Sequence, residues 1–227
     1  MMAEQVEQLD PQGINQSLTS MKVLAFECSL LDKLFIFAIR KLQIANCKSR
    51  NAMRKHNGMR PIDVIVLLKI IALDETAWLQ KELAQTLFIS NSEVSESLHR
   101  SQVAGLLDTT KQHPMRQNLL DFLRYGLRYV FPVQPGGLVR GIPTAHSAPT
   151  LAGKFVSQMA YVWADPEGTV MGHEIEPLYA TVPQACLIDS QLYELVALVE
   201  MLRVGRVREV QLATQKLSEH LLHHAVA

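Results

Sequence analysis

The chain has 227 residues, a formal net charge of zero and a hydrophobic content of 48%. This composition indicates a folded protein with a sizeable core and argues against a disordered one. The three cysteines are far apart and form no CxxC pair, so neither a zinc site nor a disulfide framework is indicated. We therefore expect no metal and no cofactor. An odd cysteine number and the lack of a signal-peptide pattern predict a cytoplasmic protein.

Charge is unevenly distributed along the chain although its sum is zero. Residues 40–60 carry seven basic residues and no acidic ones. Residues 61–110 carry three basic and seven acidic residues, a net of −4, and residues 111–140 carry five basic and one acidic, a net of +4. Basic segments thus flank an acidic one. This pattern fits contacts to phosphates on either side, and it equally fits an ordinary solvated surface.

The first sixty residues contain one clear helical pattern. Residues 1–20 are polar, show no period and are interpreted as a loose leader. Within residues 21–60, a broad apolar stripe predicts a helix over 22–45, followed by a basic linker. The apolar run 23–42 contains Glu27, Asp32, Lys33, Arg40 and Lys41, which excludes a membrane span.

Residues 61–131 are predicted to form a helix-turn-helix domain. Pro61 suits the first turn of a helix over 62–73. A second helix is expected over 78–87, and a third starts at Ser90 or Asn91 and ends near Gly105. Ser90 and Glu93 have the spacing of an S-x-x-E capping box.

The third predicted helix combines an apolar inner side with polar outward positions. A helix with a polar N-terminal side, supported on a first helix after a short turn, has the geometry that enters a DNA major groove. An ordinary helical hairpin within a core is the alternative interpretation. The outward positions are Asn91, Ser92, Ser95, Glu96, His99 and Arg100.

The segment KELAQTLFISNSEVSESLHRSQVAGLL resembles the helix-turn-helix of bacterial winged-helix regulators of the MarR-like kind. The resemblance implies a trihelical winged core, binding to double-stranded DNA and a homodimer, in which the helix over 22–45 either builds the dimer or packs in the core. Three residues depart from the family pattern: Phe88 stands where glycine is common, Glu96 where Arg or Lys is common, and Ser101 at an apolar core position. The matching residues are Glu82, Leu83, Ala84, Leu87, Ile89, Ser90, Ser92, Val94, Ser95, Leu98, Ala104, Gly105 and Leu106.

The wing of this family is a β-hairpin that follows the third helix, and its sequence signal is weak here. Residues 108–114 are short and polar, and residues 115–131 already predict another helix with Gly126 inside it. The wing is therefore either a stub near 108–113 or is supplied elsewhere in the chain.

Residues 132–227 are expected to form a C-terminal region with a small hairpin and a helical tail. The Pro- and Gly-rich stretch 132–151 is the strongest boundary signal in the chain. Residues 161–163 and 169–171 read as paired strands around a turn at 165–168. Asp189 or Ser190 should cap a helix that Gly205 interrupts. The predicted fold class is therefore mainly α with a small β component, built as a winged helix-turn-helix core with extra N- and C-terminal helices.

These patterns favour a DNA-binding transcriptional regulator that reads a near-palindromic site as a homodimer. Asn91 can contact adenine, Arg100 guanine or phosphate, and Ser92 and Ser95 suit either kind of contact. Glu96 either accepts from a cytosine amino group or repels DNA. A protein-interaction module, such as an antitoxin-like partner of a toxin, is the alternative. No nucleophile and base combination, phosphate loop or metal set is evident, so we do not expect an enzyme. The full set of candidate DNA-binding residues is Ser90, Asn91, Ser92, Ser95, Glu96, His99, Arg100, Lys111, Arg116, Arg54 and Lys55.

Overall fold

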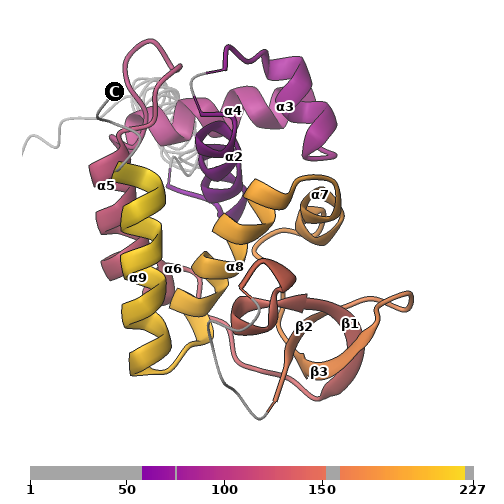
Figure 1. Ribbon diagram of the computed structural model, residues 1–227. Coiled ribbons are helices and arrows are strands. Elements are labelled where there is room, and N and C mark those ends of the chain that lie inside the picture. The colour runs from indigo at the N-terminus through magenta and orange to yellow at the C-terminus, as the bar shows by residue number, and fades with distance from the viewer. Residues whose placement is uncertain (1–57, 75, 152–158, 223–227) are drawn as a thin grey trace, which may run out of the picture. The chain divides into compact units, whose positions relative to one another are not determined.

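The computed structural model describes residues 58–74, 76–151 and 159–222, all within a compact unit that spans Asn57–Ala227. The predicted leader, the N-terminal helix and Arg54 and Lys55 of the basic linker lie outside the described residues. The described part is mainly helical with a small three-stranded sheet, which confirms the coarse fold class (Figure 1).

The elements follow one another as helices, strands and helices. The first helices are α2 (Pro61–Ala72), α3 (Gln80–Thr86), α4 (Asn91–Val103) and α5 (Arg116–Asp121), continued by the π-helical η1 (Phe122–Gly126) and by α6 (Leu127–Val130). The strands are β1 (Leu138–Thr144), β2 (Tyr161–Ala164) and β3 (Val170–Glu174), with the 3₁₀ turns η2 (Ala145–Ser147) and η3 (Pro149–Leu151) after β1. The last helices are α7 (Val182–Ile188), α8 (Ser190–Val204) and α9 (Val207–Leu222).

Helix α2 is buried on every side, as its nearly uninterrupted apolar sequence requires. It starts at Pro61, as predicted, and packs against both α4 and α8. The buried Lys69 ammonium donates to the Asp189 carboxylate at 2.6 Å, so a charge pair joins α2 to the start of α8. One hydrophobic cluster contains residues from 61–131 and from the C-terminal region. The Pro- and Gly-rich stretch 132–151 therefore lies between the first helices and the strands, but both of these parts belong to one hydrophobic core.

The helix predicted over 115–131 forms, with a π-helical insertion in its middle. Gly126 ends this insertion, and its N-terminal neighbours wind more loosely than in an α-helix. The helix packs against α9, as Figure 1 shows, and its apolar side is formed by Leu119, Leu123 and Leu127. The 3.6-residue period of the apolar residues thus predicted the helix correctly. It could not predict the π-helical turn, in which the backbone winds more loosely.

A short hairpin connects α4 to α5, at the first of the two places considered for a wing. Its arms make a single β-bridge between Leu107 and Pro114. Backbone hydrogen bonds from Met115 to Leu106 and from Asp108 to His113, at 2.9 and 3.0 Å, close it. We call Leu106–Met115 the α4–α5 hairpin.

The predicted hairpin of residues 161–171 is wrong in its pairing, although both strands and the turn exist. β2 and β3 pair with each other in parallel, and each pairs with β1 in the antiparallel sense, which closes a three-stranded barrel. The connection after β2 turns at Asp165, whose carbonyl accepts from Gly168 N–H at 3.0 Å. Glycines allow the close approach: a Cβ on Gly141 would lie 2.0 Å from the Trp163 carbonyl oxygen, and one on Gly168 would lie 2.3 Å from the Gly141 backbone.

The C-terminal helices form as predicted, and α8 runs between α2 and the barrel (Figure 1). Asp189 caps α8 by accepting from the backbone of Gln191 and Leu192, and Gly205 separates α8 from α9. Helix α7, which precedes α8, was not predicted. Among the described helices, none combines the length and the apolar character that a membrane crossing would require.

Candidate nucleic-acid interface

The turn between α3 and α4 is tight and carries a strained residue. Phe88 adopts a φ of +55°, the left-handed conformation for which glycine is the usual choice. The turn is held from both sides: Ile89 N–H donates to the Ala84 carbonyl at 3.0 Å, and the Thr181 hydroxyl donates to the Leu87 carbonyl at 2.7 Å. Tertiary contacts thus stabilise a turn that the Phe88 departure had marked as unusual.

Ser90 caps α4, as the sequence predicts. Its hydroxyl oxygen accepts from the Glu93 backbone N–H at 3.1 Å. The Glu93 side chain does not complete the box, since its carboxylate accepts instead from Arg100 at 2.8 Å. Helix α4 therefore begins at Asn91 with its N-terminal side open to solvent.

The outward side of α4 carries short polar side chains. Val94, Ser97 and Leu98 are buried, whereas Ser95 and Glu96 between them are exposed, as the spacing of a helix requires. This exposed row, which we call the α4 polar face, has no Lys or Arg side chain. Its members are Asn91, Ser92, Ser95, Glu96 and His99.

Arg100 does not belong to the α4 polar face, which corrects its assignment as a base or phosphate contact. Its side chain is 6% exposed and donates from Nε and Nη2 to the carboxylate of Asp63 at 2.9 and 2.7 Å. It also donates to Glu93 at 2.8 Å and to Glu96 at 3.4 Å. The hydrogen bonds with Asp63 raise the pKa of Arg100 further, so the guanidinium stays charged. The reason for the inward orientation is the fully buried carboxylate of Asp63, which requires a partner.

This ion network joins α4 to α2. Asp63 also accepts from the Arg60 backbone N–H at 2.7 Å, and the Arg60 guanidinium lies 3.8 Å from Glu93. Removal of one member of such a buried pair leaves an uncompensated charge, which is far more destabilising than the pair is stabilising. The sequence contained one signal for the network, because Asp63 interrupts the apolar residues from Pro61 to Leu68 in α2.

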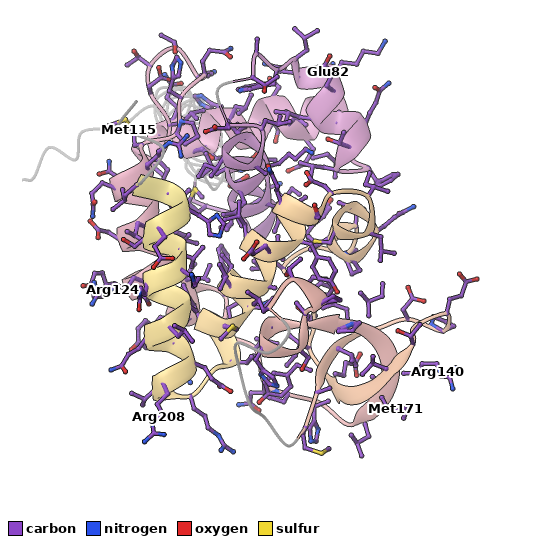
Figure 2. All side chains as sticks on the ribbon, in the orientation of Figure 1. Glu82, Met115, Arg124, Arg140, Met171 and Arg208 are labelled. Atoms are coloured by element: carbon purple, nitrogen blue, oxygen red, sulfur yellow. The ribbon has the colours of Figure 1, made fainter. Side chains whose placement is uncertain are left out.

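Basic side chains lie on the two elements that flank α4 in the chain, α3 and the α4–α5 hairpin. Lys81 is exposed in the first turn of α3, and Lys111 lies in the turn of the α4–α5 hairpin with a φ of +62°. Figure 2 labels Glu82 on α3 and Met115 at the end of the hairpin, which lie apart from each other in this view. Lys81 is not among the residues that the sequence predicted to contact DNA, because those on the motif itself lie on its second helix.

Arg116 lies away from the α4 polar face. Its guanidinium is 3.4 Å from the Asp74 carboxylate and donates to the Leu221 carbonyl at 3.3 Å. It therefore faces the space between α2 and α5 rather than the outward side of α4.

Ser101, the third departure from the family pattern, is completely buried. Its hydroxyl has no hydrogen-bond partner in the part of the chain that the structure describes. In the same part of the chain, no group of three or more His, Cys, Asp or Glu side chains is arranged to bind a metal ion. No protein-family model, curated protein or solved structure matches the chain.

Proposed function

We propose that the protein is a DNA-binding transcriptional regulator that inserts α4 into the major groove and acts as a homodimer on a near-palindromic site. The observation that carries this proposal is the α4 polar face: an exposed helix side without apolar residues, supported by α3 and α2. Asn91 can pair with an adenine edge, and Ser92 and Ser95 are short enough to let the backbone approach the bases. The residues considered for this face that remain exposed are Ser90, Asn91, Ser92, Ser95, Glu96 and His99.

Lys81 and Lys111 would neutralise phosphates on the two sides of the groove. They stand on α3 and on the α4–α5 hairpin, the elements that flank the reading helix in helix-turn-helix complexes. Such contacts supply affinity without sequence preference. In this arrangement the hairpin would act as a short wing.

Selection of bound duplexes from a random-sequence pool tests the proposal, followed by binding measurements across a salt series. We expect an enriched near-palindrome and an affinity whose logarithm falls linearly with the logarithm of salt concentration. The K81Q/K111Q variant should reduce the salt slope by about 2 per protomer without changing the enriched sequence. K216Q is the matched control, because Lys216 is on α9 and pairs with Glu219.

The variant N91A addresses sequence reading itself. It should lower discrimination at one base position by about 1–3 kcal/mol and leave the salt slope unchanged. The absence of any enriched duplex at low salt would contradict the proposal.

A protein-interaction module, such as an antitoxin-like partner of a toxin, is the second candidate function. One observation favours it: Glu96 is an acidic residue on the α4 polar face, and this face has no Lys or Arg because Arg100 turns inward. This side of α4 would then bind a basic protein surface. Co-purification of a stoichiometric protein partner that E96K releases, together with no duplex enrichment, would support this second function.

A further inference from the structure

The helix formed by α5, η1 and α6 carries on its outward side a repeated pair of side chains, an arginine followed by a tyrosine. Arg124 and Tyr125 form the first pair, Arg128 and Tyr129 form the second, and all four side chains are exposed. A step of four residues is close to one full turn both in an α-helix and in the wider π-helix of η1. The two pairs therefore lie on the same side of the helix, and we call these four residues the Arg–Tyr face.

Both tyrosine rings of the Arg–Tyr face are open to solvent. Tyr125 is 60% exposed and Tyr129 is 82% exposed, whereas the leucines of the same helix are buried. The Arg124 guanidinium lies over the Tyr125 ring, 4.8 Å from its centroid, which places a positive charge beside the first ring. The helix thus packs through its leucines and leaves uncovered two aromatic rings on which a planar group can stack.

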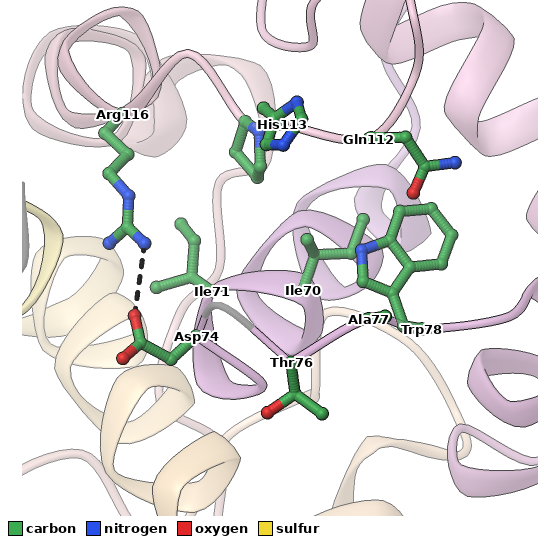
Figure 3. A pocket seen from close by; sticks show the side chains of 10 residues that line it. Ile70, Ile71, Asp74, Thr76, Ala77, Trp78, Gln112, His113 and Arg116 are labelled. Atoms are coloured by element: carbon green, nitrogen blue, oxygen red, sulfur yellow. Dashed lines mark hydrogen bonds and ion pairs between the residues drawn. The ribbon is translucent and has the colours of Figure 1, made fainter.

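The two arginines of the Arg–Tyr face differ from the arginine at the start of the same helix. Figure 3 shows that Arg116 turns to the Asp74 carboxylate, which lies 3.4 Å away. Arg124 and Arg128 have no such carboxylate partner among the residues that the structure describes. The nearby Asp121 accepts instead from a glutamine one turn earlier, at 3.2 Å. Both guanidiniums are therefore available to an external anion.

The first turn of α9 adds positive charge beside this helix. Helix α9 packs against α5, and Arg208 in its first turn is exposed. Figure 2 shows Arg124 and Arg208 projecting from the same edge of the molecule, with Arg140 at the opposite edge. An exposed carboxylate, that of Glu176, lies beyond the end of α6, because the Arg203 guanidinium donates both to its carbonyl and to the carbonyl of the residue after α6. The middle of the Arg–Tyr face is therefore positive.

The combination of charges and rings decides the class of partner. A helix that binds a lipid surface inserts an apolar side among the acyl chains, and here the apolar side is buried. A second copy of this chain would bring the same guanidiniums together, and like charges repel. An acidic peptide would engage the arginines alone. A strand of unpaired nucleotides offers phosphates to the arginines and flat bases to the tyrosines, so it uses all four side chains.

We propose that the Arg–Tyr face binds single-stranded nucleic acid, with bases stacked on Tyr125 and Tyr129 and phosphates paired with Arg124 and Arg128. The π-helical winding of η1 supports this assignment, since such insertions are frequent at functional sites. Binding of this kind tolerates many sequences, because every base has a flat face. The Arg–Tyr face is separate from the α4 polar face, and the inference does not rest on the proposed function.

Fluorescence anisotropy of the full chain with a labelled oligothymidylate tests the tyrosine half of the proposal. We expect saturable binding that Y125A/Y129A weakens by at least about tenfold, since each ring stacks on one base. Y125F/Y129F keeps both rings and should bind like the wild type. K81Q/K111Q is the control for attachment beside α4 and should retain most of the binding.

A salt series and a second probe test the arginine half. R124Q/R128Q should reduce the slope of log affinity against log salt by about 1.4, the change expected for two phosphate contacts to a single strand. R140Q removes an exposed cation at the opposite edge of the molecule and should keep the wild-type slope. An abasic oligonucleotide has the phosphates without the bases and should bind at least about tenfold more weakly than oligothymidylate.

Equal affinity for the abasic strand, or full binding by Y125A/Y129A, would overturn the inference and indicate simple ion exchange. Binding to phosphatidylglycerol vesicles without binding to the oligonucleotide would overturn it as well. Circular dichroism identifies a variant that fails to fold, and in that event the comparison of the two oligonucleotides on the wild-type protein decides the question. Duplex selection by α4 is measured separately, so either proposal can fail without the other.

Discussion

The α4 end and the barrel end of the described unit are stabilised by different means. Helix α4 follows a local period, starts at a capping serine and is joined to α2 by charged side chains. The barrel is closed by pairings between strands far apart in the sequence and by backbone contacts at glycines. The two ends are connected by α8, which packs on α2 and on the turn after β1 (Figure 1).

This difference shows which substitutions each end tolerates. At the α4 end, outward side chains can change without disturbing the core, because only the inward positions and the ion network are buried. At the barrel end, even a methyl group on certain backbone positions has no space. Side chains on the outward side of α4 can therefore vary, whereas the barrel tolerates no added Cβ at its close backbone contacts.

The largest effect is expected for G141A at the barrel end. A Cβ at this position would lie 2.0 Å from a backbone oxygen of β2, a contact that no rotamer change can relieve. We expect a loss of at least about 4 kcal/mol in the free energy of unfolding, or failure to fold. G137A is the control, since nothing lies within 4 Å of its added Cβ. Urea unfolding of both variants checks the prediction, and similar curves would contradict the close-packed barrel.

The next largest effect is expected for R100M at the α4 end. This variant fills a similar volume but leaves the buried Asp63 carboxylate without its guanidinium partner. The free energy of unfolding should fall by about 3–5 kcal/mol. The double variant D63N/R100M removes the unpaired charge and should recover part of this loss. Thermal or urea unfolding measures both, and a change within about 0.5 kcal/mol for R100M would show that the network is not buried.

A smaller effect is expected for S90A at the start of α4. The alanine cannot accept from the Glu93 N–H, so we expect a loss of about 1 kcal/mol in the free energy of unfolding. S92A, two residues further along, removes an exposed hydroxyl that does not cap the helix and should be nearly neutral. An equal loss in both variants would place the start of α4 elsewhere.

The smallest and most local effect concerns pH and the α4–α5 hairpin. Desolvation raises the pKa of Asp108, but hydrogen bonds from Thr110, His113 and Gln112 outweigh it and hold that pKa well below its usual range. Because the folded-state pKa is depressed, the carboxylate stabilises the hairpin above the ordinary Asp pKa, about 4, and this contribution is lost as pH falls below it. Amide chemical shifts of the hairpin between pH 6 and 2 should report its opening. D108N should remove this pH dependence, and an unchanged profile would contradict the assignment.

Much of the helical structure was predictable from local chemistry. Pro61 marked the start of α2, Ser90 the start of α4 and Asp189 the start of α8, because each satisfies or removes a backbone donor that a helix end leaves unpaired. Gly205 likewise marked the end of α8. The coarse fold class follows from these positions, since most of the described chain lies in elements with a 3.6-residue period.

The errors arose where long-range contacts prevail over local pattern. Arg100 was assigned to the surface because its spacing fits the outward side of α4, yet Asp63, 37 residues earlier, draws it into the core. The pairing of β2 and β3 was misjudged because a turn between two short strands usually makes an antiparallel hairpin. The exposure of the α4 polar face was predicted correctly, since Asn91, Ser92 and Ser95 are all exposed.

The amino-acid sequence by itself determined where α2, α4 and α8 begin, and it placed Asn91, Ser92 and Ser95 on the outward side of α4. These properties depend on neighbours within about four residues, through capping and through helical spacing. Only the tertiary structure decided that Arg100 turns inward and that the strands close into a barrel. These features require residues that are distant in the sequence to come into contact. The need to pair a buried charge and the close approach of backbones at glycines then determine which contacts form.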